Sequence, residues 1–359
     1  MSRLFNFSAG PGALPLPVLE QAAAELVDFR GAGMSLLEMS HRGAIYDAVH
    51  RECVADLRAL LGASEDHALI FMGGGGRTQF ALVPTNLRPT GSATYADTGS
   101  WSSGAISEAR KLGAAHTAWS SAESGYDRVP GPGELAVPPD AAYLHYTSNN
   151  TIYGTQYQYV PESGTVPLVC DMSSDILSRP VDVARYGLIY AGAQKNLGPA
   201  GVTLVVIRRD LLERSRAELP QMWSYKAVAA KDSMLNTPPV YAIYMVGLVA
   251  KHLLAQGGAA GIATLNERKA ARIYAVIDGS AFWRGHAQPS SRSLMNVTFR
   301  SPSAELDARF VKEANAAGLV GLKGHASVGG LRASLYNSVP DAAAVALAEF
   351  MTQFERRAG

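Results

Sequence analysis

The chain has 359 residues, of which 47% are hydrophobic and 18% are charged, so it has ample material for a folded core. Its formal net charge is +1 without a basic block, which argues against a nucleic-acid-binding or membrane-surface protein. No apolar run approaches the ~20 residues of a membrane span. Cys53 and Cys170 lie in apolar patterns, and the eight histidines lack metal-ligand spacing. We expect buried free thiols, no metal site and a cytoplasmic protein.

The first elements in the chain are an arm and two helices. Residues 1–15 form a turn-rich arm, and Pro17 begins a helix. The apolar face of that helix is expected to hold Leu19, Ala22, Ala23 and Leu26. After a polar loop at 39–43, a second helical stripe consists of Ile45, Val49, Cys53, Leu57 and Leu60.

From residue 67 onward, strands alternate with helices. The expected strands are 67–72, 92–96, 114–119, 143–146, 168–170, 188–191 and 202–207. We expect a helix over 77–83 that Pro84 ends, and a helix that Ser102 caps and that runs to Lys111. This alternation predicts an α/β domain with a mainly parallel sheet.

The C-terminal third follows a different pattern. The helix at 241–254 is apolar almost all round and is expected to be buried, and glycines at 257–261 mark a boundary. Helices and short strands then follow one another to the end of the chain. We therefore predict a large domain over 16–257 and a small α+β domain over 258–359.

Lys195 lies just past an apolar strand, between Gln194 and Asn196. Desolvation at such a place lowers the pKa of the amine, and a neutral amine forms a Schiff base with an aldehyde. Asp171 lies at the end of another apolar strand, 24 residues upstream. A strand-end lysine and a strand-end aspartate match the needs of pyridoxal phosphate: one holds its aldehyde carbon, the other keeps its ring nitrogen protonated.

Three further segments fit such a cofactor. The loop Gly73–Gly76 joins a strand to a helix start, where backbone amides bind phosphate, and it does not follow the dinucleotide-binding pattern. Trp101 follows a strand and can stack on a planar ring, and Thr151 offers a hydroxyl to a phenolate oxygen. Taken singly, a tight turn, a core tryptophan and a loop-capping threonine explain these residues as well.

Several cationic side chains lie beside these loops and are candidates to bind anions. They are His41, Arg42, Arg77, His325 and Arg332. Arginine matches the geometry of carboxylate and phosphate groups, although any one of these residues alone is more often a solvated surface residue.

Seven blocks of sequence together resemble one family. They are residues 5–11, 38–42, 73–77, 171–180, 190–199, 232–239 and 329–336. From end to end the chain is similar to the phosphoserine aminotransferases, which are class-V, fold-type-I pyridoxal phosphate enzymes. The resemblance implies a large domain with a mainly parallel seven-stranded sheet and a small C-terminal α+β domain.

The resemblance also implies a function for individual residues. Lys195 would hold the cofactor aldehyde and shuttle the proton, and Asp171 would pair with the ring nitrogen. The other cofactor-binding residues would be Gly76, Arg77, Trp101, Thr151, Gln194, Asn236 and Thr237, the last two from the partner subunit of a homodimer. The substrate-binding residues would be Ser8, Ala9, His41, Arg42, Arg77, His325 and Arg332, with Arg332 on the α-carboxylate.

The implied reaction is a ping-pong transamination of 3-phosphohydroxypyruvate with L-glutamate, which gives O-phospho-L-serine and 2-oxoglutarate. The family also often acts in pyridoxine synthesis, and the sequence leaves that open. One departure is Ala326, where the family usually has a basic residue after the histidine. Two alternatives also stay open: a lyase with the same cofactor, and a non-catalytic nucleotide-binding protein that uses the glycine loop.

Overall fold

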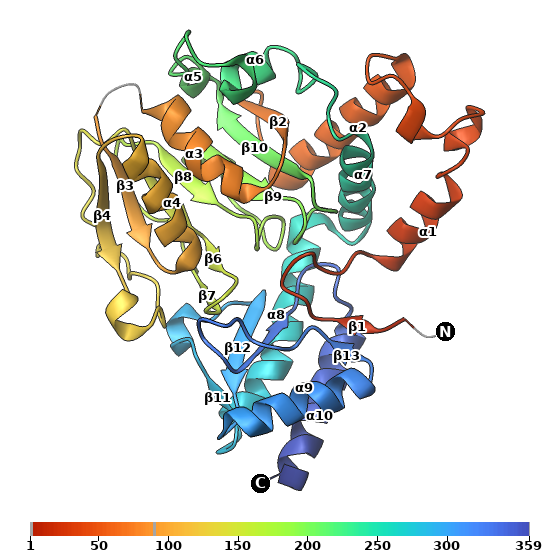
Figure 1. Ribbon diagram of the computed structural model, residues 1–359, viewed down its shortest axis with the longest axis vertical. Helices are drawn as coiled ribbons and strands as arrows, with labels where there is room; N and C mark the ends of the chain where they lie inside the picture. Colours follow the sequence, from red (N-terminus) through yellow and green to blue (C-terminus); the bar gives the residue numbers. More distant parts are fainter. Residues whose placement is uncertain (1–2, 89–90, 359) are drawn as a thin grey trace.

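The computed structural model describes residues 3–88 and 91–358, and a seven-stranded sheet forms its centre (Figure 1). The strand order is β2-β10-β9-β8-β5-β3-β4. The strands are β2 (His67–Gly73), β3 (Ala93–Asp97), β4 (Ala115–Ser120), β5 (Tyr143–Thr147), β8 (Leu168–Asp171), β9 (Leu188–Gly192) and β10 (Val202–Arg208). β10 is antiparallel to both β2 and β9, and the other pairings are parallel, which confirms the predicted mainly parallel sheet.

Helices cover both faces of this sheet, because its strands are apolar on both sides. In β2, Ile70 points toward the core beneath α3 (Gly76–Leu87) and α4 (Ser100–Lys111). Its neighbour Phe71 points to the other core, which α2 (Ala44–Leu61) and α7 (Val240–Ala255) complete. Cys53 and Cys170 are buried free thiols, as predicted.

The C-terminal residues build a third core, to which the N-terminal arm adds a strand. β1 (Phe5–Asn6) pairs in parallel with β13 (Leu319–Val320), so the N-terminal arm lies beside the C-terminal third of the chain (Figure 1). The other elements here are α8 (Gly258–Asp278), β11 (Arg284–Gly285), β12 (Asn296–Arg300), α9 (Ala304–Ala316), β14 (Leu331–Ser334) and α10 (Asp341–Ala358). The division between residues 257 and 258 stays a prediction.

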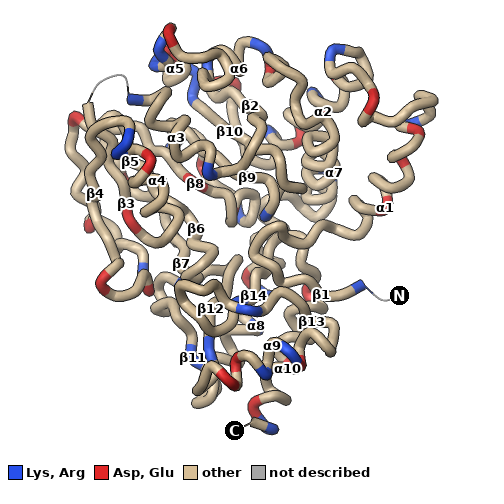
Figure 2. Tube along the Cα trace, in the orientation of Figure 1, with Lys and Arg blue, Asp and Glu red and all other residues tan. Residues whose placement is uncertain are grey.

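Short elements connect these three cores. They are α1 (Leu16–Ala24), β6 (Asn149–Asn150), β7 (Thr155–Gln156), α5 (Arg209–Leu212) and α6 (Tyr225–Ala229). Among the described residues no single helix is long and apolar enough to cross a membrane, and only α7 and α8, bent by 80° at their junction, pass that test as a pair. Figure 2 shows Lys and Arg interspersed with Asp and Glu along the trace.

Three local predictions were wrong. α3 does not end at Pro84 but continues to Leu87, and the side chains of Thr85 and Asn86 donate to carbonyls of the preceding turn. Gly99, not Ser102, precedes the first residue of α4; the Ser102 hydroxyl instead accepts from the amide of Thr98, at 2.8 Å.

The predicted apolar face of the first helix was also too long. α1 ends at Ala24, and Leu26 lies beyond it with 40% of its surface exposed. Ala22 is buried as predicted, whereas Ala23 is exposed. Sequence periodicity therefore located this helix and overestimated the surface that it buries.

Candidate active site

A cavity of about 630 Å³ lies where the carboxyl ends of the parallel strands meet the N-terminal arm and β14. In open α/β sheets ligands bind at this edge. Ten of the residues predicted from the sequence line it: Ala9, Gly76, Arg77, Trp101, Thr151, Asp171, Gln194, Lys195, His325 and Arg332. They come from segments that are far apart in the chain, so the fold itself assembles most of the predicted site.

Lys195 lies in the turns that follow β9, and its amine points to Thr151 and Trp101. Lys195 Nζ donates to Thr151 Oγ1 at 2.7 Å, and it lies 5.3 Å from the centroid of the Trp101 ring. Burial lowers the pKa of the Lys195 amine to about 8, and the nearby Asp171 carboxylate limits the shift. The amine is therefore much closer to neutrality at physiological pH than an exposed lysine.

Asp171 ends β8, which is the strand next to β9. The carboxylate is 6% exposed, and Asp171 Oδ1 accepts from the amide of Ser173 at 2.9 Å. A buried carboxylate with a backbone donor is fixed in orientation and favours a cationic partner. The neighbouring strand ends thus bring Lys195 and Asp171 into one cavity, as their positions in the sequence predicted.

The glycine loop and the first turn of α3 form the part of the cavity that suits a phosphate. Gly74 has a φ of 98°, and a Cβ there would lie 2.8 Å from Thr78 Oγ1, so the turn requires glycine. Gly76 begins the 12-residue helix α3, whose first amides have no partners within the helix. Amides at a helix N-terminus attract anions.

Arg332 and His325 also line the cavity. Arg332 Nη1 donates to the carbonyl of Thr151 at 3.2 Å, and Arg332 Nε has no partner among the described residues. His325 Nδ1 accepts from the amide of Ser327 at 3.2 Å, which leaves the other ring nitrogen to carry a proton toward a ligand. The arrangement can bind a molecule with an anion at each end.

The residues present fit pyridoxal phosphate. Two buried polar atoms at the cavity, Trp101 Nε1 and Gln194 Oε1, have no hydrogen-bond partner within residues 3–88 and 91–358. Trp101 lines the cavity, and the centroid of its ring lies 5.3 Å from Lys195 Nζ and 5.7 Å from Arg77 Cζ. An aromatic face, a buried carboxylate, an amine and a helix N-terminus are the groups that this cofactor needs.

Five predicted residues do not line the cavity. Ser8 precedes the wall formed by Ala9, and its amide bonds to Asn6 Oδ1. His41 and Arg42 lie in the turn before α2. Asn236 and Thr237 are exposed beside a separate cavity of about 470 Å³. A single chain therefore does not complete the site that the resemblance implied.

The sequence analysis missed Ser173, which lines the cavity two residues after Asp171. Ser173 Oγ accepts from the amide of Gly192 at 3.0 Å, and a Cβ on Gly76 would lie 3.0 Å from it. A hydroxyl shortly after a strand-end aspartate was the available signal. Phe80 and Ile152, which also line the cavity, carried no signal beyond apolar character.

Comparisons with known proteins agree with this geometry. The family model of class-V aminotransferases matches residues 4–344. A phosphoserine aminotransferase of Lysinibacillus sphaericus is 51% identical over 99% of both chains. The solved phosphoserine aminotransferase of Bacillus circulans subsp. alkalophilus has a TM-score of 0.98 at 51% identity, over 99% of both chains.

A third relative bears on the cofactor. The solved pyridoxal phosphate-bound phosphoserine aminotransferase of Trichomonas vaginalis has a TM-score of 0.93 at 38% identity, over 98% of this chain and all of that one. The predicted fold, cofactor and reaction class are thereby confirmed. The chain belongs to the class-V aminotransferases and, among them, to the phosphoserine aminotransferases.

Proposed function

We propose that the cavity around Lys195 is the site at which 3-phosphohydroxypyruvate and L-glutamate are converted into O-phospho-L-serine and 2-oxoglutarate. The observation that carries this proposal is the placement of a pKa-lowered lysine and a buried aspartate at neighbouring strand ends, with Arg332 facing the same cavity. The use of a pyridoxine-pathway substrate in the same site stays open.

Pyridoxal phosphate, when bound, supplies an aldehyde and a ring that accepts electrons from the substrate. Lys195 Nζ would hold that aldehyde between turnovers and, once free, would take the proton from the substrate Cα. Thr151 Oγ1, 2.7 Å from Lys195 Nζ, keeps the amine oriented. The Asp171 carboxylate would favour a protonated ring nitrogen, and the Trp101 side chain would supply an aromatic surface for the ring.

The substrate groups match the remaining side chains. Arg332 binds the α-carboxylate, for which its unpaired Nε is available. Arg77 and His325 bind the phosphate of one substrate and the γ-carboxylate of the other. Ala9, with Ser8 before it, forms the wall beside the reacting carbon. One set of cations thus takes two substrates in turn, as a ping-pong reaction needs.

The active unit in this proposal is a homodimer. Asn236 and Thr237 are exposed next to Met222 and Trp223, whose surfaces are 43% and 56% exposed. Other large apolar side chains are exposed between residues 16 and 45: Leu16, Leu26, Val27, Met34, Leu37 and Ile45. We infer that these side chains are covered in the dimer, because exposed apolar patches are typical of interfaces.

The same dimer would explain the residues missing from the cavity. Asn236 and Thr237 would reach the cofactor phosphate of the partner subunit, and His41 and Arg42 its substrate phosphate. The cytoplasmic location stays a prediction, which the two buried free thiols support.

Asp171→Asn tests the proposal, because it keeps the shape of the side chain and removes its charge. We expect the purified wild-type protein to bind pyridoxal phosphate and to make phosphoserine from 3-phosphohydroxypyruvate and glutamate. The variant should lose most of the rate of each half-reaction and little cofactor affinity. Wild-type protein that binds the cofactor without transferring an amino group, or a variant with an unchanged half-reaction rate, would refute the assignment.

A further inference from the structure

Tyr336 is a fully buried tyrosine that follows β14, and its hydroxyl reaches the N-terminal arm. Tyr336 Oη donates to the carbonyl of Ala9 at 2.6 Å and accepts from Asn296 Nδ2 at 3.4 Å. Burial raises the pKa of Tyr336 to about 12, so the hydroxyl keeps its proton and acts as a donor at physiological pH. The Ala9 carbonyl belongs to a residue that lines the active-site cavity.

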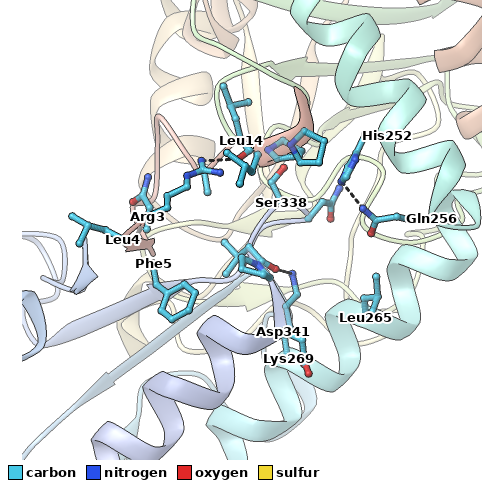
Figure 3. A pocket seen from close by; sticks show the side chains of 18 residues that line it. Arg3, Leu4, Phe5, Leu14, His252, Gln256, Leu265, Lys269, Ser338 and Asp341 are labelled. Carbon is cyan, nitrogen blue, oxygen red and sulfur yellow. Dashed lines mark hydrogen bonds between the residues drawn. The ribbon is translucent and has the colours of Figure 1, made fainter. Parts of the chain in front are cut away.

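The backbone at Tyr336 is held from the opposite side by Lys269 of α8. Lys269 Nζ donates to the carbonyls of Leu335, Tyr336 and Val339 at 2.9, 2.8 and 3.0 Å. Figure 3 shows Lys269 beneath this turn and residues of the arm across the adjoining cavity. These three hydrogen bonds therefore fix the backbone that carries the Tyr336 side chain.

The Tyr336 ring also contacts the arm. A Cβ on Gly12 would lie 2.8 Å from Tyr336 Cδ2, so the arm passes directly over the ring at this glycine. Asn296, which donates to the hydroxyl, is held in turn by Asn149 Nδ2 at 2.8 Å. The position of the hydroxyl is thus set by the arm and by two buried asparagines.

The arm itself is anchored at two places on either side of Ala9. Before it, the Phe7 amide donates to the Val320 carbonyl at 2.8 Å. After it, the Gly12 amide donates to the Gln194 carbonyl at 2.7 Å, next to Lys195. Between these anchors the Tyr336 hydroxyl fixes the part of the arm that faces the substrate.

We propose that Tyr336 is a positioning residue for the substrates: its hydroxyl holds the Ala9 carbonyl and thereby sets the wall of the pocket beside Lys195. The inference rests on the proposed function of that cavity. The hydroxyl makes no hydrogen bond to Asp171, Trp101 or the glycine loop, and among the cofactor-binding residues it approaches only the side chain of Thr151 within the described part of the chain. A loss of the hydroxyl should therefore weaken substrate binding more than cofactor binding.

Tyr336→Phe is the direct test, made in the holoenzyme. One lost neutral hydrogen bond predicts a rise of about fivefold in KM for both glutamate and phosphoserine. We expect kcat to fall by less than KM rises, cofactor affinity to change less than KM, and the amide of Gly12 to exchange hydrogen faster. The matched control is Tyr157→Phe, because Tyr157 is also fully buried and its hydroxyl has no partner among the described residues.

Gly12→Ala provides a second variant that keeps the hydroxyl and displaces the arm, because the added Cβ would lie 2.8 Å from Tyr336 Cδ2 and 3.0 Å from the Lys195 carbonyl oxygen. It should also raise KM for both substrates. A tyrosine that only stabilises the fold would lower the melting temperature and leave KM unchanged, and that outcome in both variants would overturn the proposal. A wild-type protein without transaminase activity would instead overturn the proposed function, so the two failures are distinguishable.

Discussion

One chain supplies most of the predicted residues of the strand-end cavity, whereas the predicted residues in segments 39–43 and 232–239 lie outside that cavity. Lys195 and Asp171 follow adjacent strands, so closing the sheet brings them together. Asn236 and Thr237, which only the family resemblance singled out, lie exposed beside another cavity. One chain therefore assembles the chemical centre, and in the proposed dimer a second copy would supply the outer groups.

Lys195→Ala should have the largest effect, because no other residue can take its place at the substrate Cα. We expect turnover to fall by several orders of magnitude while the cofactor still binds weakly through the remaining contacts. Borohydride reduction of the wild-type holoenzyme should label the peptide that contains Lys195. A label on Lys226 or Lys231 instead would show that Lys195 is not the residue that binds the cofactor aldehyde.

Heterodimers of two different variants test whether Arg42 acts in the active site of the partner subunit. If Arg42 serves the site of the partner subunit, a dimer of one Lys195→Ala chain and one Arg42→Ala chain contains one intact site. Isolated with two different tags, it should have about half of the wild-type turnover per dimer. If Arg42 acted in its own chain, both sites would be defective and activity would stay low.

The control pairs two residues from the chemical centre. A dimer of one Lys195→Ala chain and one Asp171→Asn chain has a defect in each site, because both side chains act within their own subunit. It should therefore recover no activity. Recovery in this control would show that the centre, too, is shared between subunits.

The sequence predicted the chemical centre well because its signals were local. An apolar strand followed by Lys195 or Asp171 fixes which edge of the sheet each residue occupies. Tyr336 gave no such signal, since its partner Ala9 is 327 residues away in the chain. Pro84 misled the helix prediction because a proline usually ends a helix, and here the tertiary contacts of α3 outweigh that local cost.

The titration of Lys195 should also make the stability of the protein depend on pH, which is a smaller effect than the loss of turnover. The pKa of Lys195 is about 8 in the folded protein against an ordinary value of 10.5. Between these values the unfolded chain binds more protons, so stability without cofactor should rise with pH from 8 to 10.5. Below pH 8 the amine is charged in both the folded and the unfolded state, so it does not make the stability depend on pH.

Lys195→Met isolates this contribution. Lys269, whose pKa burial lowers to about 7, titrates in both proteins and cancels from the difference. The melting temperature of the wild type should therefore rise relative to that of the variant as the pH increases from 8 to 10.5. A difference that is independent of pH would mean that the amine is not desolvated.

The smallest effect concerns the outer anion site. Ala326 is exposed in the loop that carries His325, and the family usually has a basic residue there. An added charge-assisted hydrogen bond contributes about 1.5–3 kcal/mol, and in so exposed a loop we expect the low end, or about tenfold in affinity at most. Ala326→Arg should tighten phosphoserine more than glutamate, because a phosphate carries more charge than a γ-carboxylate.

Ala326→Gln is the matched control for this substitution, since it adds length and hydrogen-bonding capacity without charge. If charge is the missing component, the arginine variant should favour phosphoserine and the glutamine variant should leave the ratio of the two affinities unchanged. If Lys323 or the Arg42 of a second copy already neutralises the phosphate, both variants should crowd the loop equally. Equal or weaker phosphoserine binding by the arginine variant would then show that the outer site is complete without a cation at 326.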